Sequence, residues 1–344
     1  MTDLTAIPAI ATAPPTVTPQ ATHHRPATPQ RLMRLLAIAR RLGAALFVML
    51  TAATLVFFGM KLAPGDILDI IAGQATSELA RAEVATAWGL DRPLWEQYGS
   101  YLSRLLQGDL GHSYILGRPV LDVILERSSA TLALASLSML FALALAFGII
   151  ILTGTGKRWA AALSSVVELL LVSAPSFWLG ILLIFLVSFK LNLLPIVGQD
   201  AFAILILPAL TLGLRIGGEL LQIMRSEISR VQQQPFALSA KARGISAIGF
   251  SYHHALRHAA LPVVTVAGWI VGSLLTGTFV VEQLFGRTGL GTLTVKAVLS
   301  RDTPLVMGIA LAAAAVYISI STLVDLLQGL LDPRLRQTRS PARN

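Results

Sequence analysis

The chain has 344 residues, of which 54% are hydrophobic and 13% are charged. This balance excludes an ordinary water-soluble globular protein with a polar surface. The net charge of +9 does not indicate nucleic-acid binding, because the basic residues lie beside apolar runs without interleaved aromatics and suit membrane topology better. The absence of cysteine excludes disulfides, thiolate metal sites and cysteine nucleophiles.

The N-terminal part of the chain is predicted to be a polar tail followed by one span. Residues 1–41 combine a Thr-, Pro- and Ala-rich stretch with a basic flank that should hold this end in the cytoplasm. Residues 42–62 are an apolar run long enough to cross about 30 Å of hydrocarbon as a helix. Residues 63–129 carry mixed charge and are too polar to span, so they are predicted to form a small external subdomain.

Five further apolar runs follow, which makes the expected fold an all-α membrane protein with six spanning helices. A short basic loop after the second run and a long polar segment after the fourth, 225–260, should both face the cytoplasm. The core of the bundle is expected within 130–329, and 330–344 should be a second cytoplasmic tail. The predicted spans are 130–152, 163–189 around Pro175, 203–224, 261–281 and 304–327.

Small residues and glycine motifs within these spans are interpreted mainly as structural. Gly213 with Gly217, and Gly268 with Gly272, have the spacing that lets helix backbones approach closely in lipid. The sequence 154–157 lacks the spacer and the Ser or Thr of a phosphate loop, so no ATP site is expected there. The glycines at 286, 289 and 291 lack the preceding strand of a dinucleotide fingerprint and are predicted to form a turn.

Candidate functional side chains are few. His253, His254 and His258 include two histidines at i and i+4, but no third ligand lies nearby, so no metal site is expected. No serine, histidine and aspartate set or HExxH motif supports catalysis, and the chain is not expected to be an enzyme. Glu168 and Glu282 lie near span ends and are predicted to sit at the interface, where they reach water.

Arg215 and Glu219 are the most unusual pair, because ionised groups at mid-span require a partner or water. Their i, i+4 spacing places both side chains on one face of the fourth span. Two interpretations are open. The pair either serves only to neutralise itself, or it is a polar patch that lines a translocation path, which we favour because an apolar pair would cost less against lipid.

An ordered set of short motifs resembles the permeases of the dipeptide/oligopeptide/nickel family of ABC importers, over about residues 42–336. It is similar to the first of the two permease subunits of such importers, although Thr288 and Ser321 replace residues that are common there. The motifs are DRPL at 91–94, QY at 97–98, GDLGHS at 108–113, SAPSFW at 173–178, LRHAALP at 256–262, VE at 281–282, GLG at 289–291, RD at 301–302 followed by Pro304, and LDPR at 331–334.

The resemblance implies a six-helix type I ABC importer permease and a cytoplasmic coupling segment that docks into a groove on an ATPase subunit. This segment is Ser239, Ala240, Lys241, Ala242, Arg243 and Gly244. Its small residues allow close seating, and its two cations can pair with acids at the rim of the groove. A solvated helix is the alternative, and Leu238 replaces an acidic residue of the broader loop pattern.

The resemblance also implies the function and the partners. The chain would form half of the inner-membrane path for di- or oligopeptides, with nickel or other small solutes as alternative substrates. Its partners would be a second permease chain, two ATPase subunits that bind ATP and magnesium, and an external binding protein. No cofactor is expected in this chain. A different class, a stand-alone secondary transporter or channel gated by Arg215 and Glu219, would need no ATPase-docking segment, and a membrane scaffold would show no transport phenotype.

Overall fold

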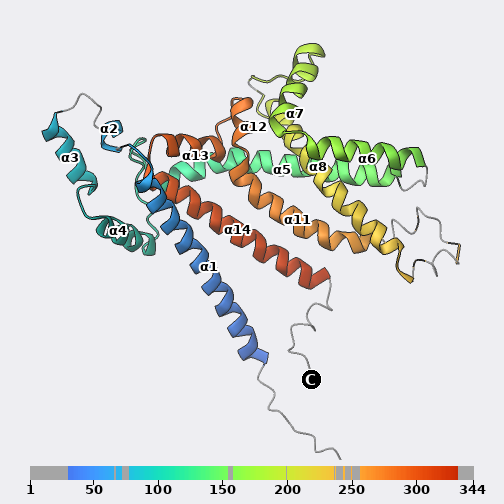
Figure 1. Ribbon diagram of the computed structural model, residues 1–344, viewed down its shortest axis with the longest axis horizontal. Helices are drawn as coiled ribbons and strands as arrows, with labels where there is room; N and C mark the ends of the chain where they lie inside the picture. The colour runs from blue at the N-terminus through green and yellow to red at the C-terminus, as the bar shows by residue number, and fades with distance from the viewer. Residues whose placement is uncertain are drawn as a thin grey trace, which may run out of the picture. The chain divides into compact units, whose positions relative to one another are not determined.

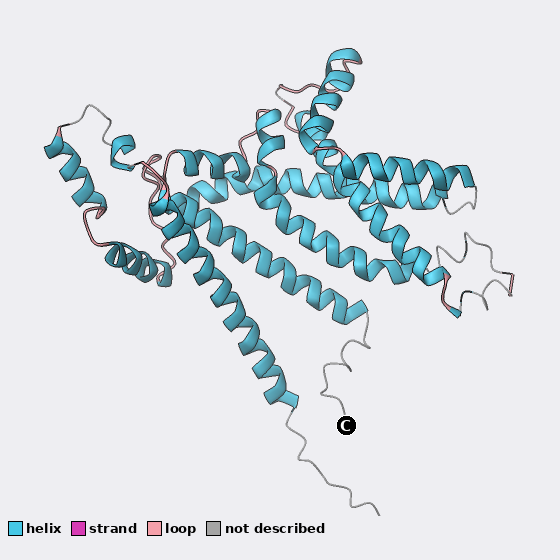
Figure 2. Ribbon diagram, viewed as in Figure 1, coloured by secondary structure: helices cyan, strands magenta, loops and turns pink. Residues whose placement is uncertain are grey.

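All regular elements among the residues that the computed structural model describes are helices, and the only bridge among these residues is an isolated pair between His112 and Pro119 (Figures 1 and 2). By its internal contacts the chain divides into residues 1–44 and 45–344, and the packing described below lies within the second unit. The described residues are 30–65, 67–71, 77–153, 158–198, 200–235, 237, 243–244, 249 and 256–331.

The first predicted span is part of a longer helix, α1 (Gln30–Leu62), and the polar segment after it contains three short helices. These are α2 (Ile67–Ile71), α3 (Glu78–Trp88) and α4 (Leu94–Leu106). The Ser77 side chain accepts a hydrogen bond from the amide of Ala80 and caps the start of α3. Gly89, at φ 66°, ends α3 in the left-handed conformation that glycine adopts without steric cost.

Two long helices, α5 (Val120–Thr153) and α8 (Ala203–Gln232), form the centre of the bundle. A side chain at Gly213 would lie 2.7 Å from Phe141, and one at Gly217 would lie 2.7 Å from Leu145, so both glycines are needed for the close approach of α8 to α5. In its apolar stretch 61% of α8 is buried, against 28% for α5 and 33% for α14 (Thr303–Leu331). The predicted packing role of these two glycines is confirmed.

The third predicted span is not one continuous helix. It consists of α6 (Arg158–Ser173), α7 (Ser176–Leu183) and a π-helical continuation, η1 (Ile184–Lys190), with a bend of 107° at the break. Pro175 has no amide hydrogen to donate, and its ring disfavours helical geometry at the preceding residue, Ala174. The segment predicted as the third span around Pro175 is therefore not one straight helix, and the proline marks the break. Whether the bent pair crosses the membrane as one span stays a prediction.

The C-terminal part contains α11 (Leu256–Gly277), α12 (Phe279–Leu284), α13 (Leu290–Leu299) and α14. Helices α11 and α14 lie side by side (Figure 1). A side chain at Gly268 would collide with Val324, and one at Gly272 would lie 2.9 Å from the ring of Tyr317. This second glycine pair also has the packing role that the sequence predicted.

Within the described ranges, four helices are long and apolar enough to cross a membrane: α1, α5, α8 and α14. The bent pair of α6 with α7 and η1 would make a fifth. The described apolar part of α11, Pro262–Leu274, is shorter than a span requires. The chain is thus an all-helical protein with several candidate spans, and the count of six stays a prediction.

Candidate functional site

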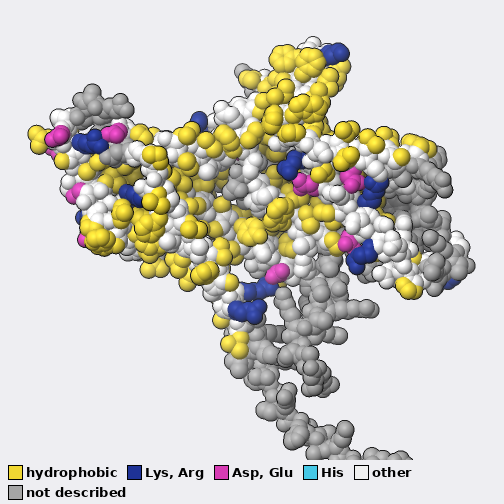
Figure 3. Space-filling model, in the orientation of Figure 1, with side chains coloured by type: hydrophobic (Ala, Val, Ile, Leu, Met, Phe, Trp, Pro, Cys, Tyr) yellow, Lys and Arg dark blue, Asp and Glu magenta, His cyan; other side chains and the backbone are white. Residues whose placement is uncertain are grey.

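The predicted pair on α8 forms. Arg215 Nη2 lies 2.9 Å from Glu219 Oε1, with 47% of the arginine side chain and 26% of the glutamate side chain exposed. Figure 3 shows that basic and acidic side chains meet in neighbouring pairs on a face of the molecule that is otherwise largely apolar. The structure therefore confirms the ion pair, and the lining of a path stays a prediction.

The pair belongs to a polar stripe along α8. Gln222 and Ser226 are exposed. Gln222 is three residues after Glu219, and Ser226 is four residues after Gln222, so both lie on the same face of the helix as the ion pair. The opposite face is occupied by the core, where Leu220, Leu221 and Met224 are completely buried. The most buried of the four candidate spans thus still has a polar face, and lipid does not satisfy the polar groups of this face.

A second ion pair connects α6 to α8, and no local sequence pattern indicates it. Arg225 Nη1 lies 2.8 Å from Glu168 Oε2, and Arg225 Nη2 also donates a hydrogen bond to the hydroxyl of Ser165. Arg225 begins the segment 225–260 that is predicted to be cytoplasmic, and Glu168 is predicted to be an interfacial acid. The two residues are 57 positions apart, so only the packing of α6 against α8 brings them together.

Glu282 is not interfacial, which corrects the prediction made for it. It is 1% exposed and lies in α12, a short helix that follows a break at the end of α11. Its Oε1 accepts hydrogen bonds from the hydroxyls of Thr131, at 3.0 Å, and Thr278, at 2.8 Å. Its Oε2 accepts one from the amide of Thr292, at 2.8 Å. The carboxyl group thus joins α5, α12 and α13 in the interior.

The glycines at 289 and 291 are explained by this buried group. A side chain at Gly289 would collide with the Glu282 carboxyl, and one at Gly291 would lie 2.7 Å from the amide nitrogen of Phe279. Only Gly286, at φ 63°, has the turn conformation predicted for all three. The presence of glycines soon after a glutamate in a span was the one signal that could have suggested a buried carboxyl.

A second buried carboxyl, Asp302, connects two of the motifs that the sequence singled out. The hydroxyl of Ser113 donates to Oδ2, and the amides of Tyr114 and Ile115 donate to the two oxygens at 3.1 and 3.3 Å. Asp302 precedes α14, and its Oδ1 also accepts from the amide of Leu305 at 3.4 Å. Hydrogen bonds therefore hold the polar segment before α5 against the start of α14, although Ser113 and Asp302 are 189 positions apart in the sequence.

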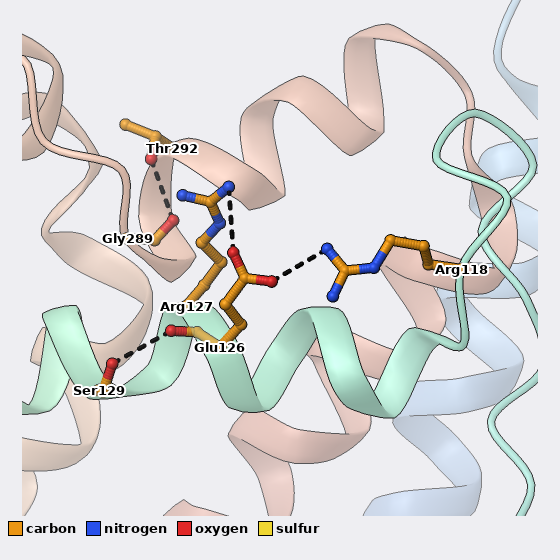
Figure 4. A network of polar contacts seen from close by, with 6 residues as sticks. All are labelled: Arg118, Glu126, Arg127, Ser129, Gly289 and Thr292. Carbon is orange, nitrogen blue, oxygen red and sulfur yellow. Dashed lines mark hydrogen bonds and ion pairs between the residues drawn. The ribbon is translucent and has the colours of Figure 1, made fainter.

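The charged groups at the start of α5 form an exposed network, which contrasts with these buried carboxyls (Figure 4). Glu126 lies between Arg118, at 3.0 Å, and Arg127, at 3.6 Å, and about half of its side chain is exposed. The hydroxyl of Ser129 donates to the Glu126 carbonyl, and that of Thr292 to the Gly289 carbonyl. Exposed ion pairs of this kind contribute about 0–1 kcal/mol.

The predicted coupling segment lies mostly outside the described residues. Of its six members, only Arg243 and Gly244 are described; both are exposed in a turn, and Gly244 has φ 77°. His253, His254 and the side chain of His258 also lie outside the described part, as does the loop at 154–157. Among the residues that were described, no cluster of three metal-ligating side chains occurs.

Comparisons with known proteins agree with the motifs and the helical architecture. Residues 144–337 match the family described as binding-protein-dependent transport system inner membrane component. Residues 32–135 match the N-terminal part of binding-protein-dependent transport system membrane components. The two matches together include α8, Glu282 and Asp302, with the loop at Ser113 that holds Asp302.

Full-length relatives support the same assignment. The chain is 38% identical over 310 residues to a Brucella abortus protein assigned as a peptide transport system permease, covering 87% of this chain and 98% of the relative. It is 36% identical over 300 residues, with the same coverage, to the glutathione transport system permease protein GsiC of Escherichia coli and of Salmonella typhimurium.

These matches decide against a stand-alone transporter, channel or scaffold. A permease of this kind is a non-catalytic, multi-pass component of the inner membrane, and it works in a complex with an ATPase, which uses the ATP, and with a binding protein. The chain belongs to the family of binding-protein-dependent transport system inner membrane components, the permeases of ABC importers.

Proposed function

We propose that the chain is the first of the two permease subunits of an importer for di- or oligopeptides and forms half of the translocation path. The relatives named for peptide and glutathione transport support this substrate class, because each is matched over 98% of its length. A second, similar permease chain would close the path. In this arrangement the chain transmits the work of two ATPase subunits and supplies no catalytic group.

The observation that carries the proposal is the uncovered polar stripe on α8. The side chains of Arg215 and Glu219 are charged and partly exposed, although the same helix buries its other faces against α5, α6, α7 and α11. Against lipid, each charged group at mid-span would cost about 2.5–3.5 kcal/mol. A water-filled path bounded by the second permease lowers this cost only once the importer is assembled, so an unpaired charge still opposes insertion and assembly. In the assembled path the two charges offer partners for the termini of a zwitterionic peptide.

Leucine substitutions of the pair test this role. Glu219→Leu leaves a guanidinium that does not lose its charge, whereas Arg215→Leu leaves a carboxyl that can take up a proton. We expect Glu219→Leu to lower the amount of assembled importer by about tenfold or more, because the cost of an unpaired charge exceeds about 1.4 kcal/mol. Arg215→Leu should have a smaller effect. Assembly is measured by co-purification of the importer subunits, and transport by uptake of a labelled dipeptide into cells.

The double variant separates the two interpretations. Replacement of both residues removes both charges, so assembly should recover while dipeptide uptake stays impaired. Glu227→Leu is the matched control, because Glu227 pairs with Arg230 at 2.6 Å near the end of α8 where the arginine is largely exposed. Uptake at the wild-type rate in the double variant would show that Arg215 and Glu219 only neutralise each other.

We further propose six spans, with both termini and the segment 225–260 in the cytoplasm, and docking of residues 239–244 on an ATPase subunit. The support is the arginine-rich flank before α1 and the four arginines after position 333. The exposed turn at Arg243 and Gly244 is consistent with a docking surface. The external subdomain then comprises residues 63–129, and the permease core 130–329.

A single cysteine variant tests the topology and the docking together, since the chain has no native cysteine. Arg243→Cys should resist a membrane-impermeant thiol reagent added to intact cells and become labelled after the membrane is permeabilised. Co-expression of the ATPase subunits should then slow the labelling several-fold, because the docked groove covers the thiol. Ser103→Cys, in exposed α4, is the control that intact cells should label. Labelling of Arg243→Cys in intact cells would contradict the proposed topology.

A further inference from the structure

A cavity of about 240 Å³ lies between the end of α1, the segment of α3 and α4, and the start of α14. None of the functions above uses it. Three basic side chains line it, those of Lys61, Arg92 and Arg104, together with Phe57, Trp88, Tyr101 and Tyr114. All of these residues are described, and no acidic side chain occurs among the residues that line the cavity. The cavity is therefore a concentration of positive charge with aromatic walls.

The basic groups come from separate elements, which local packing holds in place. Lys61 Nζ, on α1, donates to Gln97 Oε1 at 2.8 Å and lies 5.9 Å from the centre of the Phe57 ring. The Gln97 amide in turn donates to the backbone carbonyl of Arg92 at 2.8 Å. Arg92 and Arg104 each present a planar set of five donors that suits oxyanions. Arg104, on α4, completes a cationic wall of three elements.

A buried hydroxyl provides an independent sign of a missing ligand. Tyr101 is 5% exposed and lines the cavity, and among the described residues its hydroxyl has no hydrogen-bond partner. Buried polar atoms are satisfied in the large majority of cases, so an unpaired hydroxyl at a cavity wall is available to a group that enters the cavity. Burial raises the pKa of Tyr101 to about 12 and that of Tyr114 to about 12, so both hydroxyls keep their proton at neutral pH and remain donors.

We propose that this cavity binds a phosphate group, carried either by an anionic phospholipid or by free phosphate. A phosphate has up to four oxygens in a tetrahedral arrangement, which matches donors that converge from three elements better than the two oxygens of a carboxylate do. The neighbouring surface of α1 exposes Leu55, Phe58 and Leu62, which offers an apolar surface for acyl chains. The residues that line this cavity do not include Arg215 or Glu219.

Native mass spectrometry of the purified full-length chain tests whether the phosphate group belongs to a phospholipid. After delipidation, the chain is titrated with phosphatidylglycerol, and the apparent affinity of the tightest adduct is compared among variants. The Arg92→Gln/Arg104→Gln double variant should bind at least about tenfold more weakly, because two charge-assisted contacts are lost. Tyr101→Phe should lower affinity about threefold. Arg104→Lys, which keeps the charge, should retain more affinity than Arg104→Gln.

A second experiment tests whether free phosphate binds in the cavity. Inorganic phosphate at constant ionic strength should raise the thermal unfolding midpoint of the wild type and of the control Arg118→Gln, but not that of the double variant. Arg118 lies on the same segment and pairs with Glu126 away from the cavity. Lipid adducts weakened only by cavity variants identify a phospholipid, and stabilisation by phosphate with unchanged adducts identifies free phosphate. Equal lipid affinity and equal phosphate response in the wild type, the double variant and Tyr101→Phe would overturn the proposal.

Discussion

Replacing Glu282 with leucine should cause one of the two largest losses of folded protein for a single substitution in this chain. The carboxyl group accepts hydrogen bonds from Thr131, Thr278 and the amide of Thr292 in a site that is 1% exposed. Leucine leaves these three donors buried without an acceptor, and each costs about 1–3 kcal/mol. We expect a loss of about 3 kcal/mol or more, measured as the yield and thermal midpoint of monodisperse permease in detergent.

Two further variants separate hydrogen bonding from size and charge. Glu282→Gln keeps one accepting oxygen for the threonine hydroxyls but turns a donor toward the Thr292 amide, so its effect should be intermediate. Glu126→Leu removes an exposed carboxyl on α5 that pairs only with Arg118 and Arg127, and it should cost less than about 1 kcal/mol. A thermal midpoint for Glu282→Leu equal to that of Glu126→Leu would show that the network does not stabilise the bundle.

Asp302→Ala should release the segment before α5 from the start of α14. Asp302 is completely buried and accepts from the hydroxyl of Ser113 and from the amides of Tyr114 and Ile115. Alanine removes every acceptor, so we expect a loss of about 2–4 kcal/mol. Hydrogen exchange of the amides at 114 and 115 should accelerate by more than about tenfold, because their protection depends on this carboxyl.

Asp109→Ala is the matched control for this prediction. Its carboxyl lies in the same segment, but among the described residues it accepts only from the amide of Gly111, at 2.7 Å, and the residue is exposed. Loss of the Asp109 carboxyl should leave the rate of hydrogen exchange at the amides of residues 114 and 115 unchanged. Slow exchange at both amides in Asp302→Ala would mean that another part of the structure protects them.

The patterns that depend on neighbouring residues were readable in the sequence. Apolar runs predicted α1, α5, α8 and α14, because a helix must satisfy its own backbone in lipid and needs about 20 apolar residues to do so. The spacing of Arg215 and Glu219 predicted their ion pair, and the glycine pairs on α8 and α11 predicted close helix packing. The ion pair and the glycine pairs both follow from the 3.6-residue period of a single helix.

The break at Pro175 and the burial of Glu282 differ from what the sequence predicts. The apolar run around Pro175 predicts one span, but a proline and the restriction it places on the residue before it often end a helix, and here the bend is 107°. Glu282 was placed at the interface because it stands near a span end. The sequence alone does not reveal that Thr131 from α5 and Thr292 from α13 converge on it.

The sequence by itself determined that this is a helical membrane protein and which family motifs it carries. Only the tertiary structure decided where its polar groups find partners: Glu168 with Arg225, Glu282 with three threonines, Asp302 with the loop at Ser113, and the basic cavity that Tyr101 lines. The physical reason is that hydropathy and helical period act between residues a few positions apart. Thr131 is 151 positions from Glu282, and Ser113 is 189 positions from Asp302. Only the packing of the helices brings such distant groups together.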